Sequence, residues 1–145
     1  MHIAVGCDHR GHNLKQLVIE LLAEAKHDYK DFGTNSDEPV DYPDIAKKVG
    51  EAVAGGQYDY GILICGTGIG MSMAANKVRG IRAAMCHNTF GASRARQHNN
   101  ANILCLSAEE GMESAPEIVN TFLTTEFEGG RHQRRVEKIT EMECS

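Results

Sequence analysis

Runs of apolar residues without polar alternation recur along the chain, a pattern typical of parallel strands that are covered on both faces. It predicts strands over residues 3–7, 61–65, 81–86 and 103–106, with a further short strand over 29–32. Between these runs, apolar residues recur three or four positions apart, which predicts amphipathic helices. The predicted helices cover residues 14–25, 43–54, 71–79, 91–97 and 112–123, and a last helix over about 131–143 follows two glycines.

This alternation of strands and helices predicts an α/β fold in a single domain over residues 1–145. We expect a three-layer αβα sandwich around a Rossmann-like, five-stranded parallel sheet with right-handed crossovers. In the doubly wound order 2-1-3-4-5, a crevice opens between the carboxyl ends of the first and third strands. Asp8 and His9 follow the first strand, and Cys65 ends the third. The topology therefore predicts that these three side chains meet.

A glycine-rich segment, Gly66-Thr67-Gly68-Ile69-Gly70, follows the third predicted strand. Its glycines allow a sharp turn with exposed N–H groups, which predicts a site for an anion. A dinucleotide fingerprint would need a glycine where Met71 stands. A P-loop would need a lysine before Ser or Thr, whereas the first lysine after the turn is Lys77. The spacing thus favours a compact anion-binding turn with the Cys65 thiol at its entrance.

Cysteine is more often a small buried hydrophobe than a reactive group, and this remains the alternative for Cys65. Its place between a strand end and a glycine turn favours chemistry, because nearby N–H dipoles stabilise a thiolate. The other cysteines are Cys7, Cys86, Cys105 and Cys144. Their odd total and wide spacing, with no C-x-x-C pair, indicate neither a disulfide framework nor a zinc site. Reduced thiols and a chain without a metal are expected.

The formal net charge of -5 argues against nucleic acid as a partner. No stretch approaches the roughly 20 apolar residues of a membrane span, and the first residues are strand-like rather than a signal peptide. These features predict a cytoplasmic protein with no membrane partner.

Four residues at helix ends carry candidate chemistry, and each has a simpler alternative. Asp8 precedes a predicted helix and could serve only as its cap. His98 follows the predicted helix over 91–97, where a lone histidine is commonly a surface residue. Arg131 and Arg135 are one helical turn apart and form either a solvated face or a phosphate clamp.

The motifs together resemble the type B ribose-5-phosphate isomerases, a family similar to the galactose-6-phosphate and allose-6-phosphate isomerases. The resemblance covers nearly the whole chain. The motifs that carry it are Gly6-Cys7-Asp8-His9, Asp31-Phe32-Gly33-Thr34, Asp41-Tyr42-Pro43, Cys65-Gly66-Thr67-Gly68-Ile69-Gly70, Ala75-Asn76-Lys77, Gly80-Ile81-Arg82-Ala83-Ala84, Arg96-Gln97-His98-Asn99 and Gly129-Gly130-Arg131-His132-Gln133.

The resemblance implies interconversion of an aldose phosphate and a ketose phosphate, ribose 5-phosphate and ribulose 5-phosphate, through an enediolate and without a cofactor. It implies that Cys65 is the base that moves a proton between C1 and C2, with Thr67 hydrogen-bonded to the thiolate. His98 would open the sugar ring, and Asp8 would relay protons between two substrate oxygens.

The same resemblance assigns the binding residues and the assembly. Backbone N–H groups of Gly66-Thr67-Gly68-Ile69-Gly70 would stabilise the enediolate, and Asn99 would hold a sugar hydroxyl. His9, Arg131 and Arg135 would bind the phosphate. The implied assembly is a homodimer or homotetramer with sites between subunits, so that His98 and Asn99 face a neighbour's Cys65 and the last helix packs at the interface.

Three alternatives are compatible with the sequence. The substrate could be a hexose 6-phosphate, such as allose or galactose 6-phosphate. The chain could be a phosphosugar-binding module without turnover, or one subunit of a hetero-oligomer.

The chain departs from the family at the segment Ser107-Ala108-Glu109-Glu110-Gly111, where the family commonly has an arginine of the phosphate site. Acidic residues would repel a phosphate. Either this segment points away from the site, or Arg10 or Arg134 replaces the missing arginine, and we favour replacement.

Overall fold

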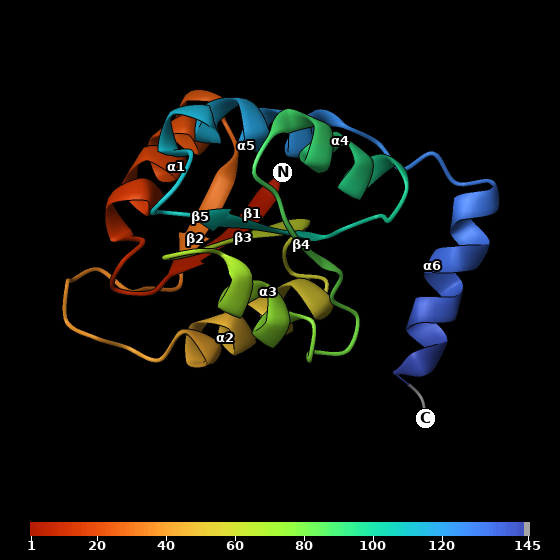
Figure 1. Ribbon diagram of the computed structural model, residues 1–145, viewed down its shortest axis with the longest axis horizontal. Helices are drawn as coiled ribbons and strands as arrows, with labels where there is room; N and C mark the ends of the chain where they lie inside the picture. Colours follow the sequence, from red (N-terminus) through yellow and green to blue (C-terminus); the bar gives the residue numbers. More distant parts are fainter. Residues whose placement is uncertain (144–145) are drawn as a thin grey trace.

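The computed structural model describes residues 1–143 and confirms the α/β sandwich. A fully parallel sheet consists of β1 (His2–Cys7), β2 (Asp28–Asp31), β3 (Tyr60–Cys65), β4 (Ala83–Met85) and β5 (Ile103–Ser107). The helices α1 (His12–Glu24), α4 (Thr89–Gln97) and α5 (Ala115–Thr124) cover one face, and α2 (Tyr42–Ala54) and α3 (Ile69–Ala75) cover the other (Figure 1). Each face buries its own apolar cluster against the sheet.

The strand order is β2-β1-β3-β5-β4, so the expected order 2-1-3-4-5 was wrong for the last two strands. β5 pairs with β3, and Cys65 lies opposite Ser107. All five residues of β5 are buried, whereas β4 has three half-buried residues and is shorter than the expected 81–86. The apolar strand takes the interior position because both of its faces are covered, and the short strand takes the edge. As a result, the loop after β5 lies next to the loop after β3.

Two helices differ from their expected bounds. The helix expected over 112–123 begins as a 3₁₀ turn, η1 (Met112–Ser114), and the α-helix starts only at Ala115. Pro116 lacks an N–H and fits an α-helix in its first turn, which places the start of α5 next to it. α3 ends at Ala75, before the expected residue 79.

The last helix, α6 (Arg131–Met142), stands apart from the sandwich (Figure 1). Its buried side chains are those of His132 and Val136. Near its end, Glu143 accepts the N–H of Gly80 at 3.1 Å through both carboxylate oxygens. A cavity of about 600 Å³, lined in part by Asn99 and Ile139, lies between this helix and the body. None of the helices in residues 1–143 is both long and apolar enough to cross a membrane.

Candidate active site

The structure brings Asp8 and His9 next to Cys65, as the topology predicted. The N–H of Asp8 donates to the carbonyl of Ile64 at 3.1 Å, one residue before Cys65. The Asp8 carboxylate is buried and accepts the N–H of Arg10 at 2.9 Å. Nδ1 of His9 accepts the N–H of Val40 at 3.2 Å. Adjacent parallel strands end at the same edge of a sheet, and this edge gathers the acid, the imidazole and the thiol.

The Cys65 sulfur lies at the start of the glycine turn and is nearly enclosed. It accepts a hydrogen bond from the N–H of Gly68 at 3.2 Å. Gly68 has a φ of +79°, and a Cβ there would lie 3.1 Å from the backbone of Leu106. The Thr67 hydroxyl accepts the N–H of Ile69 at 3.2 Å. The expected bond from Thr67 to the thiolate stays a prediction.

The other described thiols are held in their protonated form. Burial raises the pKa of Cys7 and of Cys86 to about 11. Cys105 is completely buried, and burial raises its pKa further. Cys144 lies outside the described residues. Cys7, Cys86 and Cys105 therefore serve as core residues at neutral pH, which leaves Cys65 as the chemical candidate among residues 1–143.

An ion pair lies over the glycine turn. Nη1 of Arg10 is 2.5 Å from Oε1 of Glu109, and a Cβ on Gly66 would approach both side chains within 3.2 Å. The N–H of Glu109 donates to the carbonyl of Gly66 at 3.0 Å, and the hydroxyl of Ser107 donates to the same carbonyl at 2.9 Å. The acidic segment thus does not point away from the site. This contact could not be predicted from the sequence, because the expected strand order separated β5 from β3.

Lys15 holds the loop after β2, and it was not identified from the sequence. Its side chain is fully buried, and Nζ donates to Asp31 at 2.9 Å, to the Thr34 carbonyl at 2.6 Å and to Asn35 at 2.7 Å. These bonds fix the loop after β2 beside Cys7, whose carbonyl accepts the N–H of Thr34 at 2.7 Å. Lysine on the buried face of a helix is a sequence signal, because such a charge needs a partner.

Tyr42 covers the start of α3. A Cβ on Gly70 would lie 2.6 Å from the Tyr42 ring, so the glycine is needed for this close approach. The Asp41-Tyr42-Pro43 motif drew attention to this residue without indicating where it packs.

The remaining predicted site residues gather at the opposite end of the molecule, where the end of α4 faces the start of α6 (Figure 1). The rings of His98 and His132 stack with centroids 4.2 Å apart and planes 11° apart. Arg131 and Arg135 share α6 with His132. Within residues 1–143, no hydrogen bond or ion pair joins His98, Asn99 or these arginines to the Cys65 turn.

Buried Arg96 holds the segment that carries His98 and Asn99. Its Nη1 donates to the Asn100 side chain at 2.9 Å and to the Ala101 carbonyl at 2.7 Å, and its guanidinium lies 4.8 Å from the centre of the Tyr60 ring.

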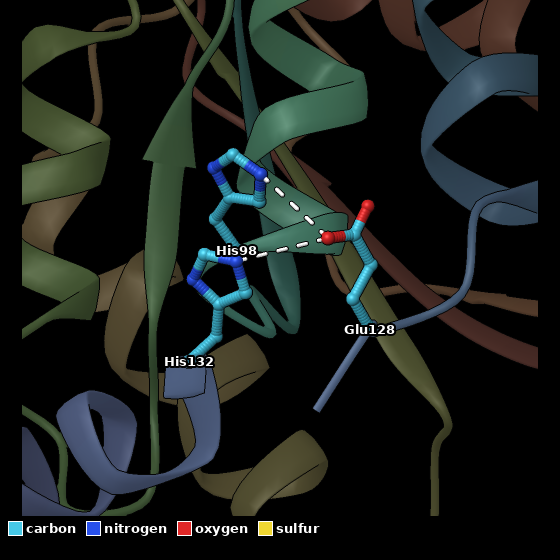
Figure 2. Close-up of side chains that lie close together, drawn as sticks. All are labelled: His98, Glu128 and His132. Atoms are coloured by element: carbon cyan, nitrogen blue, oxygen red, sulfur yellow. Dashed lines mark ion pairs between the residues drawn. The ribbon is translucent and has the colours of Figure 1, made fainter. Parts of the chain in front are cut away.

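Glu128 faces both stacked histidines (Figure 2). Its Oε1 lies 3.8 Å from Nε2 of His98 and 3.7 Å from Nε2 of His132. The three ligand atoms lie within 4.8 Å of one another, whereas tetrahedral bonds of about 2.0 Å place ligand atoms roughly 3.3 Å apart. Nearly parallel rings also cannot both aim a lone pair at one ion. The arrangement fits an electrostatic contact between the carboxylate and the two imidazoles better than a shared metal.

A parallel sheet whose carboxyl edge presents a thiol, a buried carboxylate and a turn of N–H donors defines an α/β enzyme for a small anionic substrate. A family model described as Ribose/Galactose Isomerase matches residues 3–139, and the chain belongs to that family. The chain is accordingly an enzyme of the aldose–ketose isomerase class. This confirms the resemblance seen in the sequence.

Individual relatives match over almost their whole length. The ribose-5-phosphate isomerase B of Escherichia coli strain K12 is 50% identical over 142 residues, which cover 97% of this chain and 95% of the relative. The structure of Clostridium thermocellum ribose-5-phosphate isomerase B is 52% identical, with a TM-score of 0.97 and coverage of 99% and 98%. That of the Mycoplasma genitalium enzyme with bound ribulose-5-phosphate is 45% identical, with a TM-score of 0.95 and coverage of 99% and 97%.

Proposed function

We propose that this chain interconverts ribose 5-phosphate and ribulose 5-phosphate through an enediolate, with Cys65 as the base. The observation that carries the proposal is the meeting of the Cys65 sulfur, its Gly68 N–H donor and the buried Asp8 in one crevice. The substrate follows from the E. coli relative and from the ribulose-5-phosphate bound to the M. genitalium enzyme.

The chemistry divides among the residues of the crevice. Cys65 as thiolate takes the proton from C2 and returns it to C1, while the N–H groups of the glycine turn stabilise the enediolate oxygen. Asp8 moves a proton between the two substrate oxygens. A positioned base contributes roughly a hundred- to ten-thousand-fold in rate, and each oxyanion donor about 3 kcal/mol. Phosphate binding orients the reacting carbons.

The complete site combines two subunits of a homodimer or homotetramer. Asp8, His9 and Cys65 lie at the carboxyl edge of the sheet, where β1 and β3 end. His98, Asn99, Arg131 and Arg135 belong to the end of α4 and to α6, which stands apart from the sandwich (Figure 1). A second copy supplies the missing half, with α6 packed at the interface. The weakly buried α6 and the cavity beside it support this arrangement. The cytoplasm is the proposed location.

Subunit complementation tests the shared site. Cys65→Ala and His98→Asn should each be inactive alone. A mixture refolded together should recover about a quarter of wild-type activity, because half of the dimers pair the two variants and each of these keeps one intact site. Light scattering on the same samples would report the oligomeric state. No recovery from mixed, assembled subunits would place each site within one chain.

The phosphate group of the substrate is assigned to His9, Arg131 and Arg135, with Arg10 in place of the arginine missing after β5. Arg10 lies over Gly66, beside the turn. Glu109 holds the guanidinium there, and the paired charge of Glu109 no longer repels an anion.

A hexose 6-phosphate is the second candidate substrate, because the matching family is described as Ribose/Galactose Isomerase. A panel of five- and six-carbon aldose phosphates, incubated with the purified single chain in heavy water, tests both candidates. Ketose formation and deuterium at C1 or C2 would identify the substrate. Binding without deuterium incorporation would indicate a phosphosugar-binding module, and activity of the single chain excludes an obligatory hetero-oligomer.

A further inference from the structure

Glu128 faces two stacked histidines, of which only His98 has a role in the proposed mechanism. The carboxylate belongs to the segment between α5 and α6, and the N–H of Glu128 donates to the Gln97 carbonyl at 3.0 Å. This bond fixes Glu128 beside His98, the C-cap of α4. His132 lies in the first turn of α6, and its N–H donates to the Gly129 carbonyl at 3.0 Å. Three separate backbone segments therefore hold the cluster.

The single carboxylate of the cluster can neutralise the charge of only one imidazolium. One carboxylate balances one imidazolium, and a second imidazolium stacked 4.2 Å from the first would be repelled by it. Burial, His98 and Arg131 lower the pKa of His132, Arg135 lowers it further, and Glu128 offsets part of the effect. His132 is thus the member that stays neutral. His98, whose side chain is 35% exposed against 10% for His132, is the member that a ligand can reach.

We propose that Glu128 and His132 are positioning residues that keep the His98 ring oriented for opening the sugar ring. The inference rests on the proposed function and extends it to two residues without an assigned role. Glu128 faces Nε2 of His98, so Nδ1 points away from the carboxylate (Figure 2). Donation from Nδ1 leaves the proton on Nε2, which is the tautomer that the facing carboxylate stabilises.

Ring opening proceeds by two proton transfers. The His98 imidazolium gives a proton to the ring oxygen as the bond between C1 and that oxygen breaks. The C1 hydroxyl gives its proton to Asp8 of the neighbouring subunit as the C1 carbonyl forms. Asp8 then releases a proton to solvent and His98 takes one up, which restores both groups before the next turnover. Glu128 stabilises the charged state, and the His132 ring restricts rotation of His98.

The test compares two reactions of one variant, Glu128→Gln. Isomerisation of ribose 5-phosphate starts from a cyclic sugar and needs ring opening. Exchange of the C1 hydrogen of ribulose 5-phosphate in heavy water starts from an open chain and needs the Cys65 base but not ring opening. We expect the first rate to fall by about tenfold or more and the second to change less than about twofold.

Rescue by a shorter carboxylate provides a second measurement at the same position. Glu128→Asp should restore part of the rate. Glu126→Gln is the matched control, because it removes a carboxylate two residues away in the same segment, and it should leave both reactions unchanged.

His132→Phe keeps a ring in the stack and removes its nitrogens, so it should retain most of the isomerisation rate. If this variant loses as much rate as Glu128→Gln, the assignment of a neutral His132 is wrong. If Glu128→Gln isomerises at the wild-type rate, or loses both reactions equally, Glu128 has no specific role in ring opening. Absence of C1 exchange in the wild type would instead overturn the proposed function itself.

Discussion

The N–H of Gly68 donates a hydrogen bond to the sulfur of Cys65 over 3.2 Å. Gly68 can make this bond because its backbone adopts a φ of +79°, which residues with a Cβ rarely adopt. The N–H groups of the same turn are the proposed donors to a substrate oxygen. One backbone conformation thus places a donor on the Cys65 sulfur beside the proposed oxyanion site.

Replacing Cys65 by Ala removes the proposed base while keeping the turn. Turnover should fall at least a hundred- to ten-thousand-fold, and binding of ribulose 5-phosphate should change little. Kinetics and calorimetric titration would measure the two effects. Cys86→Ala serves as the control, because that thiol is buried and protonated. A Cys65→Ala enzyme that keeps most of its rate would refute the assignment.

A comparison of Gly68→Ala with Gly111→Ala separates two effects. One is the stability lost when a residue with a Cβ adopts a positive φ, and the other is the steric effect of a Cβ in the glycine turn. Both glycines have a φ of +79°, but a Cβ on Gly111 meets open space, whereas one on Gly68 meets Leu106 and Met85. Gly111→Ala should lose only about 1–2 kcal/mol of stability and keep its kcat. Gly68→Ala should lose more stability and most of its kcat, as denaturant unfolding and steady-state assays would show. Equal effects of the two substitutions would argue against a role for the turn.

Arg10→Ala should raise the KM for ribose 5-phosphate about tenfold, since a charged hydrogen bond to phosphate would be lost. The kcat should change less, because the phosphate does not react. Lys47→Ala removes an exposed cation from α2 and should leave KM unchanged. An unchanged KM for Arg10→Ala would show that Arg10 does not replace the missing arginine and would favour another residue, such as Arg134.

Lys15→Met should destabilise the fold by about 3–5 kcal/mol, because it leaves Asp31 without the ammonium that neutralises it beneath the crevice. Urea unfolding would measure the loss. Lys47→Met, on an exposed helix surface, should stay within about 0.5 kcal/mol of the wild type. A small loss in Lys15→Met would show that the Asp31 carboxylate finds adequate solvation without its partner.

Alkaline pH should weaken the fold through its buried thiols. The pKa of Cys86 rises from 9.0 to about 11 on folding. A group with a raised pKa stabilises the fold fully below its unfolded value and loses this contribution as pH rises through the folded value. The free energy of unfolding should therefore fall between pH 9.0 and 11, and Cys86→Ala should reduce the slope. A slope identical to that of the wild type would show that Cys86 does not contribute.

The sequence alone determined the sandwich and the meeting of Asp8 and His9 with Cys65. Apolar runs and helical spacing are local properties of the chain, and they are sufficient to place strands and helices in order. Once β1 and β3 are neighbours in a parallel sheet, their carboxyl ends must share an edge. The residues after each strand therefore lie close together, and this does not depend on the details of side-chain packing.

The tertiary structure alone decided which strand lies beside β3 and which residues face His98. The order of β4 and β5 depends on how much surface each strand buries, which periodicity does not encode. The contact of Arg10 with Glu109 over Gly66 follows from that order. The stacking of His98 on His132, with Glu128 facing both, joins segments up to 34 positions apart along the chain. Such contacts arise from packing between distant elements, and no local pattern in the sequence specifies them.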